Sequence, residues 1–589
     1  MTQVISEAVR LVIWDLDETF WRGTLTEGGI EYVQAHHEIV ETLARRGIVS
    51  AICSKNDIAS VRDLLAERGL WDSFVFPSID WTSKGPRLAA MIEAIGLRPP
   101  TVLFIDDNPM NRNEALHFVP GIQVADETLV PGLLDDPRLR GKDDSKLTRL
   151  AQYKLLETRH ADMASSPDTS DFLRSSNIRV TFEHDVEAHL DRAIELVNRT
   201  NQLNFTKVRM SDDLDTARAE MRALLGQANM QAGLVRVTDN YGDYGFVGFY
   251  AVRVHSGMMA HFCFSCRTLG MGVERWVYGR LGKPIMTVAG EVLSDLHAAT
   301  PVIDWVNAAA TGPAALMPRI AGRVVIRGGC DLQAVAHYLR MVADEVVEEF
   351  PFERHGRPMR LDHSQVLLYA MDGMTPAQRD AARAIGHVDA DFESALAGPG
   401  SPPAAVLLSF QSDKLLATYQ HRESGFTTQF GVPRGHSGGD VRTTDPASLE
   451  GRFSHPTAFE HLTTLRAEYD YAAPSIEPSM ERVARVVSRI PAQTRVLVLE
   501  NIEIDYAAPG GPALNRYDVA FNVALRNAVR PFTNAETIPL DPMLHGPEDV
   551  VDRLHYRRLV YFRIYEWIMA RLTAPGVMET ATVKAARAA

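Results

Sequence analysis

Three short apolar runs in the first third of the chain each end in a cluster of polar residues. These clusters are Asp15 and Asp17, Ser54 to Asn56, and Asp106 and Asp107. Amphipathic helical patterns such as "EIVETLARRG" and "IASVRDLLAERG" separate the runs, and this alternation predicts βαβ units and a parallel sheet. Because ligands of such sheets bind at the carboxyl ends of the strands, we expect the three polar clusters to meet in one crevice.

The chain is too long for one hydrophobic core. Its 589 residues predict two to four domains. A polar stretch, "HADMASSPDTSDFLRSSN", and an Ala/Gly/Pro-rich passage, "NAAATGPAALMPRIAG", favour boundaries that give three domains, at 1–150, 151–315 and 316–589. The last third again alternates strand-like runs with helical patterns, so α/β is the expected fold class at both ends of the chain.

Composition excludes several classes of protein. The net charge of −14 argues against a nucleic-acid binder, which would need a basic face. Four cysteines are too few for a disulfide framework and indicate a reducing compartment. We find no signal-peptide pattern and no apolar run near 18 residues, so the expectation is a cytoplasmic protein without a membrane partner.

The first polar cluster has the composition of a phosphoryl-transfer site. If the strand continues, Asp15 and Asp17 lie on the same face, because side chains alternate with a period of two. One carboxylate could attack phosphorus while the other protonates the leaving group. Carboxylates this close repel each other unless a cation joins them, and Mg²⁺ prefers oxygen ligands. Asp106 and Asp107 could complete such a site.

Two further residues could act on the phosphoryl group. Ser54 can donate a hydrogen bond to a phosphoryl oxygen, and Lys84 in "TSKGP" can balance negative charge in the transition state.

Together these residues resemble the haloacid dehalogenase (HAD) superfamily. "DLDET" is similar to its DxDxT motif, while Ser54, Lys84 and "IDDNP" are similar to its second, third and fourth motifs. The resemblance implies a Rossmann-like parallel sheet in which Asp15 is the nucleophile and Asp17 the acid/base. It also implies a Mg²⁺ site, with the candidate ligands Asp15, Asp17, Asp106 and Asp107. The alternative is that these are polar strand ends without chemistry.

The second segment carries a glycine-rich loop, "RTLGMG", between a strand-like run and the helical pattern "VERWVYGRL". Glycines at this position let backbone N–H groups approach a phosphate at the helix N-terminus. The loop resembles the pyrophosphate-binding loop of GNAT acyltransferases. That resemblance implies a GNAT-like α+β domain in which Arg267, Gly270 and Gly272 hold pantetheine or phosphate. A plain strand–turn–helix is the alternative.

Cys266 immediately precedes this loop. A neighbouring arginine and a helix N-terminus would both favour its thiolate, which makes it a candidate nucleophile. The alternative is a small buried filler. Cys263 and Cys266 form C-x-x-C, but on a strand these side chains point to opposite faces, so we discount a redox or zinc motif.

Across about 9–281, the motifs together resemble the FkbH family. They include "DLDETFWRGTLTEGG", "NRTNQLNFT", "DNYGDYGFVG" and "SCRTLGMGVE". The resemblance implies an enzyme of polyketide-type biosynthesis that dephosphorylates 1,3-bisphosphoglycerate and loads the glyceryl group onto the phosphopantetheine thiol of a holo acyl carrier protein. Phe20 stands where the family often has Leu, and Met271 where it often has Arg. The alternative is a phosphatase or an acyl-phosphate-dependent acyltransferase for another small phosphorylated acid.

An acidic carrier would need a local basic surface on this acidic chain. The candidates are Arg267, Arg275, Arg280 and Lys283. The alternative is that they form a solvated helix face.

The last third pairs a cysteine with a distant D-x-x-H motif. Cys330 follows the apolar run "RVVIRGG", while Asp552 and His555 precede a long helical pattern. This order resembles the SGNH (GDSL) hydrolases, which implies a flavodoxin-like domain where Asp552 orients His555 and His555 activates the nucleophile. Here Cys330 replaces the family's serine and Gly-Gly its Gly-Asp, so a structural domain without catalysis is the alternative. Either Cys266 or Cys330 could carry an acyl group.

Overall fold

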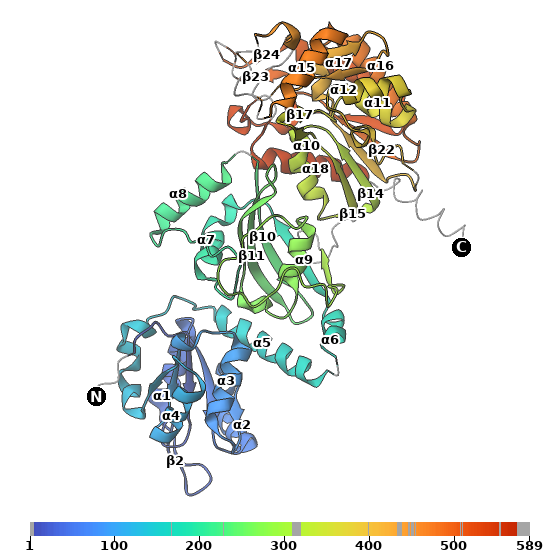
Figure 1. Ribbon diagram of the computed structural model, residues 1–589. Coiled ribbons are helices and arrows are strands. Elements are labelled where there is room, and N and C mark those ends of the chain that lie inside the picture. Colours follow the sequence, from blue (N-terminus) through green and yellow to red (C-terminus); the bar gives the residue numbers. More distant parts are fainter. Residues whose placement is uncertain are drawn as a thin grey trace, which may run out of the picture.

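The structure is a computed structural model, and three larger sheets follow one another along the chain (Figure 1). It describes residues 5–166, 168–227, 229–308, 320–398, 400–432, 439–445, 448, 453, 455–506, 508, 511–552 and 555–573. Most of the Ala/Gly/Pro-rich passage predicted as a boundary lies outside these ranges. No helix in this part of the chain combines the length and the apolar character needed to span a bilayer.

The first sheet is parallel, in the order β5-β4-β1-β6-β7, which confirms the predicted α/β class for this part of the chain. Its strands are β1 (Leu11–Trp14), β4 (Val49–Ser54), β5 (Ser78–Ile79), β6 (Val102–Ile105) and β7 (Gln123–Ala125). Its helices are α1 (Gln34–Arg45), α2 (Ile58–Glu67), α3 (Lys84–Ile95) and α4 (Pro109–Phe118). Every residue of β1 is buried, as expected for a central strand covered on both faces.

The first strand ends sooner than the sequence suggested. After Trp14 the chain turns sharply, and the amides of Thr19, Phe20 and Trp21 all donate to the carbonyl of Leu16. Within this turn Glu18 has a left-handed φ of +55°. The expectation that Asp15 and Asp17 share one face of a continuing strand is therefore wrong, because the strand stops before either residue.

Helix α5 (Thr148–Ser165) crosses the boundary predicted at residue 150. Its residues Leu150 and Tyr153 pack against the apolar core on one face of the first sheet. The first unit, as we use the term below, therefore runs through α5 (Figure 1).

The second unit is built on a six-stranded sheet in the order β13-β8-β10-β11-β12-β9. Its strands are β8 (Ile178–Glu183), β9 (Leu203–Asn204), β10 (Met230–Thr238), β11 (Asp243–Arg253), β12 (Met258–Phe264) and β13 (Val306–Ala308). Its longer helices are α7 (Leu190–Arg199), α8 (Leu214–Leu225) and α9 (Val273–Arg280). Neighbouring strands from β8 to β9 pair antiparallel, while β13 pairs parallel to β8. The arrangement is α+β.

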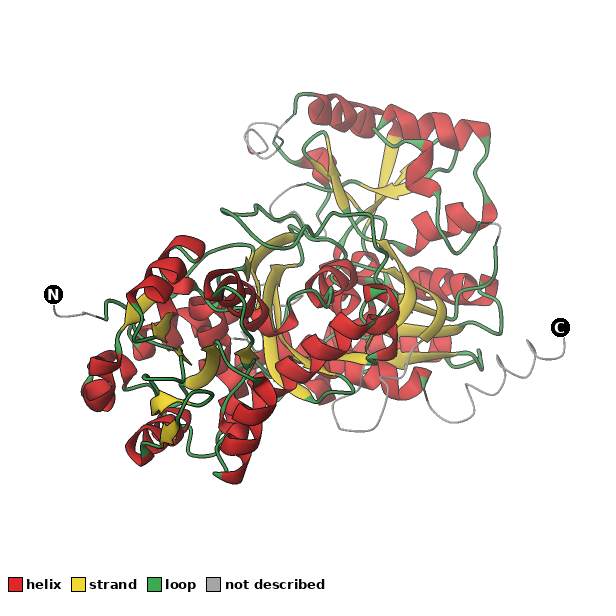
Figure 2. Cartoon of the chain, turned by 90° about the horizontal axis from the view of Figure 1, so that it is seen from below, coloured by secondary structure: helices red, strands yellow, loops and turns green. Residues whose placement is uncertain are grey.

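The third unit has a parallel five-stranded sheet in the order β15-β14-β18-β22-β25, which agrees with the predicted α/β pattern. Figure 2 shows helices lying beside the strands along the whole molecule. Its strands are β14 (Ile320–Arg327), β15 (Ala343–Glu349), β18 (Ala405–Leu408), β22 (Arg495–Leu499) and β25 (Ala535–Ile538). Its helices include α10 (Cys330–Leu339), α11 (Ser364–Asp372), α16 (Ile476–Arg489), α17 (Arg516–Val529) and α18 (Arg558–Leu572).

The second and third units share one hydrophobic core. A continuous cluster of buried residues extends from Phe172 in the second unit to Leu572 in α18. Polar contacts cross the same interface: the Tyr338 hydroxyl donates to Gln231 Oε1 over 2.6 Å, and the Tyr250 hydroxyl lies 3.3 Å from His337 Nε2. The two units therefore pack as one body.

Candidate active sites

The carboxyl end of the first sheet gathers the predicted phosphoryl-transfer residues around one lysine. Lys84 begins α3, and its Nζ lies 2.6 Å from Asp15 Oδ1 and 2.7 Å from Asp106 Oδ2. Asp15 follows β1, Asp106 follows β6, and all three side chains are almost fully buried. Ser54, at the end of β4, lies near Asp15 and acts to lower the pKa of that carboxyl. The expected crevice is thus a buried cluster of opposite charges.

Burial and charge shape the protonation of this cluster. Burial raises the pKa of Asp15 to about 6, although the ammonium group of Lys84 opposes the shift. Burial works against the charge of Lys84, yet the carboxylates of Asp15 and Asp106 leave its pKa raised. Lys84 therefore stays an ammonium ion at neutral pH and holds the two carboxylates together.

Three carboxylates of this site fit a divalent cation. Asp15, Asp106 and Asp107 each offer an oxygen, and these oxygens lie within 4.8 Å of one another. Oxygen ligands are those that Mg²⁺ prefers. The carboxylate of Asp17 lies outside this group, although Asp17 was among the predicted ligands.

Asp17 is held in a pocket of donors instead. Its Oδ1 accepts from Trp21 Nε1 over 2.8 Å and from the Leu25 amide over 3.2 Å, while its Oδ2 accepts from Asn56 Nδ2 over 3.0 Å. The turn after β1 produces this geometry, because it carries Asp17 away from the line of the strand. Both oxygens of Asp17 are thus oriented by these donors, away from the group formed by Asp15, Asp106 and Asp107.

Several supporting residues escaped the sequence reasoning. Asn111 Nδ2 donates to both oxygens of Asp106, over 3.0 and 3.1 Å, and the Asn108 amide donates to Asp106 Oδ1 over 2.9 Å. The Asp107 amide donates to Thr19 Oγ1 over 3.0 Å. The run "NPMNRN" after the two aspartates was a usable signal, because it places amide side chains in the first turn of α4.

The third unit brings the predicted cysteine, histidine and aspartate into contact. Cys330 is the first residue of α10, and its Sγ lies 2.9 Å from His555 Nε2. On the other side of the ring, Nδ1 of His555 lies 2.8 Å from each carboxylate oxygen of Asp552. Cys330 and His555 are 225 positions apart in the chain. The three side chains have the geometry of a nucleophile–base–carboxylate triad.

The histidine of this triad, His555, carries a positive charge at neutral pH. The hydrogen bond to Cys330 raises the pKa of His555 to about 9, helped by Asp552 and opposed by burial. At neutral pH His555 is therefore an imidazolium that can pair with a thiolate at Cys330. The sulfur belongs to the first residue of α10, at the positive end of the helix dipole.

Steric contacts explain why glycine stands at position 328, the first of the two glycines before Cys330. A Cβ on Gly328 would lie 2.7 Å from Leu332 Cδ1 and 2.9 Å from Ser409 Cβ, so no larger residue fits. Ser409, at the end of β18, donates over 2.5 Å to Asp331, whose pKa burial raises to about 6. The sequence reasoning missed this pair, although Asp331 directly follows Cys330 in the chain.

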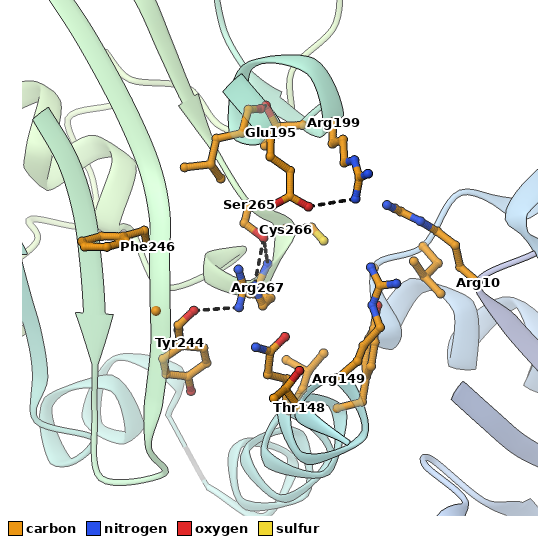
Figure 3. Close-up of a pocket in the computed structure, with 18 of the residues that line it drawn as sticks. Arg10, Thr148, Arg149, Glu195, Arg199, Tyr244, Phe246, Ser265, Cys266 and Arg267 are labelled. Carbon is orange, nitrogen blue, oxygen red and sulfur yellow. Dashed lines mark hydrogen bonds and ion pairs between the residues drawn. The ribbon is translucent and has the colours of Figure 1, made fainter. Parts of the chain in front are cut away.

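The glycine loop of the second unit has the predicted strand–loop–helix form. Gly270 and Gly272 have φ values of +75° and +71° just before α9. A Cβ on Gly272 would lie 2.7 Å from Ile303 Cδ1, and Met271 is fully buried. Arg267 and Cys266 line a cavity (Figure 3). Burial raises the pKa of Cys266 although the charge of Arg267 opposes the shift, so the expectation that this position favours the thiolate is wrong.

The arginines predicted to form a carrier-binding surface have separate roles. Arg267 lies in that cavity, whereas Arg275 donates to the carbonyl of Ala298 over 2.6 Å and Arg280 donates to the carbonyl of Ala343 over 3.3 Å.

No model of a known protein family matches the sequence, and no curated protein matches it. The N-terminal part is similar to solved phosphatases. The phosphatase-containing N-terminal part of a Bacteroides fragilis protein, solved with Mg, is 24% identical, with a TM-score of 0.19, over 24% of this chain and 40% of that chain. The cobalt-bound deoxy-D-mannose-octulosonate 8-phosphate phosphatase of Haemophilus influenzae is 18% identical, with a TM-score of 0.17, over 19% and 66%.

A third structure is 3-deoxy-D-manno-octulosonate 8-phosphate phosphatase from Moraxella catarrhalis, in complex with magnesium ion, phosphate ion and its octulosonate ligand. It is 15% identical, with a TM-score of 0.17, over 27% of this chain and 94% of that chain. This chain spans less than two thirds of the first two solved chains. These values are too low to assign a function, which must come from the side-chain geometry.

Removing the ammonium group of Lys84 should leave the carboxylates of Asp15 and Asp106 to repel each other. We expect Lys84→Met to lower the free energy of opening of the β1 amides by about 3–5 kcal/mol in EDTA, measured by hydrogen exchange. In a protein that already carries Asp15→Asn, Lys84→Met should lower this free energy of opening by clearly less, because one of the two repelling carboxylates is gone. Arg62→Met, which removes an exposed ion pair with Asp63, should cost below about 1 kcal/mol. Equal losses in both backgrounds would refute the proposed coupling.

The pairing of Cys330 with His555 should be visible in thiol reactivity. His555 keeps its charge below about pH 9 and loses it above, so His555→Gln should slow alkylation of Cys330 roughly 10- to 30-fold at pH 7 and little at pH 10. Peptide mass spectrometry after iodoacetamide treatment measures the rate, with the Cys266 peptide as internal reference. A rate at pH 7 that is the same in both proteins would contradict the triad.

Proposed function

We propose that the chain is a phosphatase and acyltransferase that converts 1,3-bisphosphoglycerate into a glyceryl thioester on the phosphopantetheine of a holo acyl carrier protein. The observation that carries the phosphatase half is the buried contact of Lys84 with Asp15 and Asp106, beside Asp107, where three parallel strands end. The substrate and the carrier rest on the resemblance of the motifs to the FkbH family.

Phosphate removal begins with attack of an Asp15 oxygen on phosphorus, which forms an aspartyl phosphate as the bond to the leaving oxygen breaks. Asp17, oriented by Trp21 and Asn56, protonates that oxygen and later takes a proton from the hydrolytic water. Lys84 and the Ser54 hydroxyl face the negative charge that develops on the phosphoryl oxygens.

Asp15, Asp106 and Asp107 would hold a Mg²⁺ ion, which would supply further positive charge against those oxygens. The observation that supports this cofactor is the group of three carboxylate oxygens within 4.8 Å of one another.

Acyl transfer is the chemistry that the triad supports. The Cys330 sulfur attacks the activated carbonyl, a carbon–sulfur bond forms, and the bond to the phosphate leaving group breaks. The proton that His555 received from the thiol passes to the departing phosphate. When the carrier's thiol attacks the thioester, His555 takes its proton and returns it to Cys330. Cys266 is the second candidate for the same relay.

Intact-mass spectrometry of a holo carrier protein tests the proposal. The mixture contains the enzyme, Mg²⁺ and 1,3-bisphosphoglycerate made in situ. We expect a glyceryl adduct with the unaltered enzyme and an adduct that retains phosphate with Asp15→Asn, because only the monoester needs this carboxylate. Loading should fail in one of Cys266→Ala and Cys330→Ala.

Cys53→Ala is the matched control for the cysteine variants, since Cys53 is buried in β4 and should not affect loading. Release of phosphate without any change in the carrier would contradict the transferase half. In that case the alternative, a phosphatase for another small phosphorylated acid, would stand.

A further inference from the structure

A cavity of about 570 Å³ lies between the first unit and the second (Figure 3). Its walls come from the amino end of the first sheet, from α5 and the segment before it, and from α7 and the loops around β11 and β12 of the second unit. Cys266 lies in this cavity, and the Cβ that Gly96 lacks would be 3.7 Å from its Sγ. The thiol therefore faces the first unit.

The lining is strongly cationic. Seven arginine or lysine residues contribute to it against three carboxylates, in a chain whose net charge is −14. The cations are Arg10, Arg98, Lys142, Arg149, Arg192, Arg199 and Arg267. Glu195 pairs with two of them, Arg192 over 2.6 Å and Arg199 over 2.8 Å. Arg98 pairs with Glu7, and Arg149 donates to the carbonyl of Gly47 over 3.0 Å. The lining as a whole keeps a net positive charge.

Arg10 is a half-buried cation of this lining. Within the described ranges its guanidinium makes no hydrogen bond and no ion pair. Burial lowers the pKa of Arg10, and the nearby charges of Arg149 and Arg199 lower it further. Figure 3 shows these three guanidinium groups turned toward one another across the cavity. Such an arrangement is costly unless an anion lies between them.

Arg267 adds a fourth guanidinium on the side of the thiol. It donates to Ser265 Oγ over 3.2 Å and to the carbonyl of Tyr244 over 2.7 Å, so its position is fixed. Burial, with the charge of Arg192 adding to it, lowers the pKa of Arg267 to about 10. This cation too would gain from an anionic partner.

We infer that this cavity is a binding site for a phosphate monoester or acyl phosphate, with the phosphate held among Arg10, Arg149 and Arg199 and the rest of the ligand directed toward Cys266. Guanidinium groups match phosphate oxygens with paired, charge-assisted hydrogen bonds, and three of them converging suit a dianion. The volume accommodates a small phosphorylated acid or the end of a phosphopantetheine arm. Only the identity of the phosphorylated acid rests on the proposed function.

This site lies at the opposite edge of the first sheet from the carboxylate cluster. Arg10 immediately precedes β1 and Asp15 immediately follows it, which separates their Cα atoms by about 16 Å in an extended strand. Figure 1 agrees, since β2 (Arg22–Thr24), which follows the Asp17 turn, lies at the end of the first unit remote from the second. A phosphate in the cavity is therefore not the phosphate that Asp15 attacks.

Protection of Cys266 from alkylation tests the site without using catalysis. The full chain is treated with iodoacetamide in EDTA, alone or with inorganic phosphate, 3-phosphoglycerate or glycerate, and the Cys266 and Cys330 peptides are quantified. We expect both phosphate-bearing probes to slow alkylation of Cys266 but not of Cys330, and glycerate to have no effect. Arg10→Gln should raise the concentration needed for protection at least about tenfold, and Arg62→Gln should leave it unchanged.

Calorimetric titration of 3-phosphoglycerate into the unaltered protein and Arg10→Gln gives a second readout that does not need a reactive thiol. We expect Arg10→Gln to weaken binding of 3-phosphoglycerate in this titration by the same factor. Binding of equal strength in both proteins, or none in either, would overturn the site. A parallel titration with phosphopantetheine distinguishes the sources of the phosphate: the tighter ligand identifies whether a free acid or a carrier arm enters the cavity. Asp15→Asn should keep full binding, so failure of the phosphatase proposal would leave this result intact.

Discussion

The contact of Lys84 with Asp15 and Asp106 is the interaction on which the first unit depends. Three parallel strands end at this point, and two buried carboxylates would repel each other there without the ammonium group. Because Lys84 also begins α3, the same residue joins a helix to the carboxyl edge of the sheet. The contact of Lys84 with the two carboxylates therefore serves both the chemistry of the site and the packing of the strand ends. A change to any of these three residues is expected to affect stability and chemistry together.

The protein distributes its reactive groups over three places. The carboxylate cluster lies at one edge of the first sheet, Cys266 lies beyond the opposite edge, and the Cys330 triad lies in the third unit. The first two places lie at opposite ends of β1, about 16 Å apart, which is more than a three-carbon acid spans. An acyl group processed at more than one of them must travel, and a flexible arm that ends in a thiol is a chemically suitable vehicle. The shared core of the second and third units keeps their sites at a constant separation.

Sequence reasoning reached the candidate residues but not all of their roles. Asp15 and Asp106 follow from polar residues at the ends of apolar runs, and Lys84 follows from the motif "TSKGP". Cys330, Asp552 and His555 follow from their order along the chain. Asp17 was assigned as a ligand because alternation was extended past Trp14. The turn closed on the carbonyl of Leu16 ended that alternation. The boundary at residue 150 failed for a similar reason, since nothing local shows that Leu150 and Tyr153 pack on the first sheet.

The sequence by itself determined which segments become buried parallel strands and which polar residues follow them, because burial and the period of two are local properties of the chain. Only the tertiary structure decided what those residues meet. The contact of Cys330 with His555 spans 225 positions, and the group of Arg10, Arg149 and Arg199 comes from three separate elements. Such contacts depend on how finished elements pack, and packing is set by shape and charge across the whole molecule rather than by any neighbouring residue.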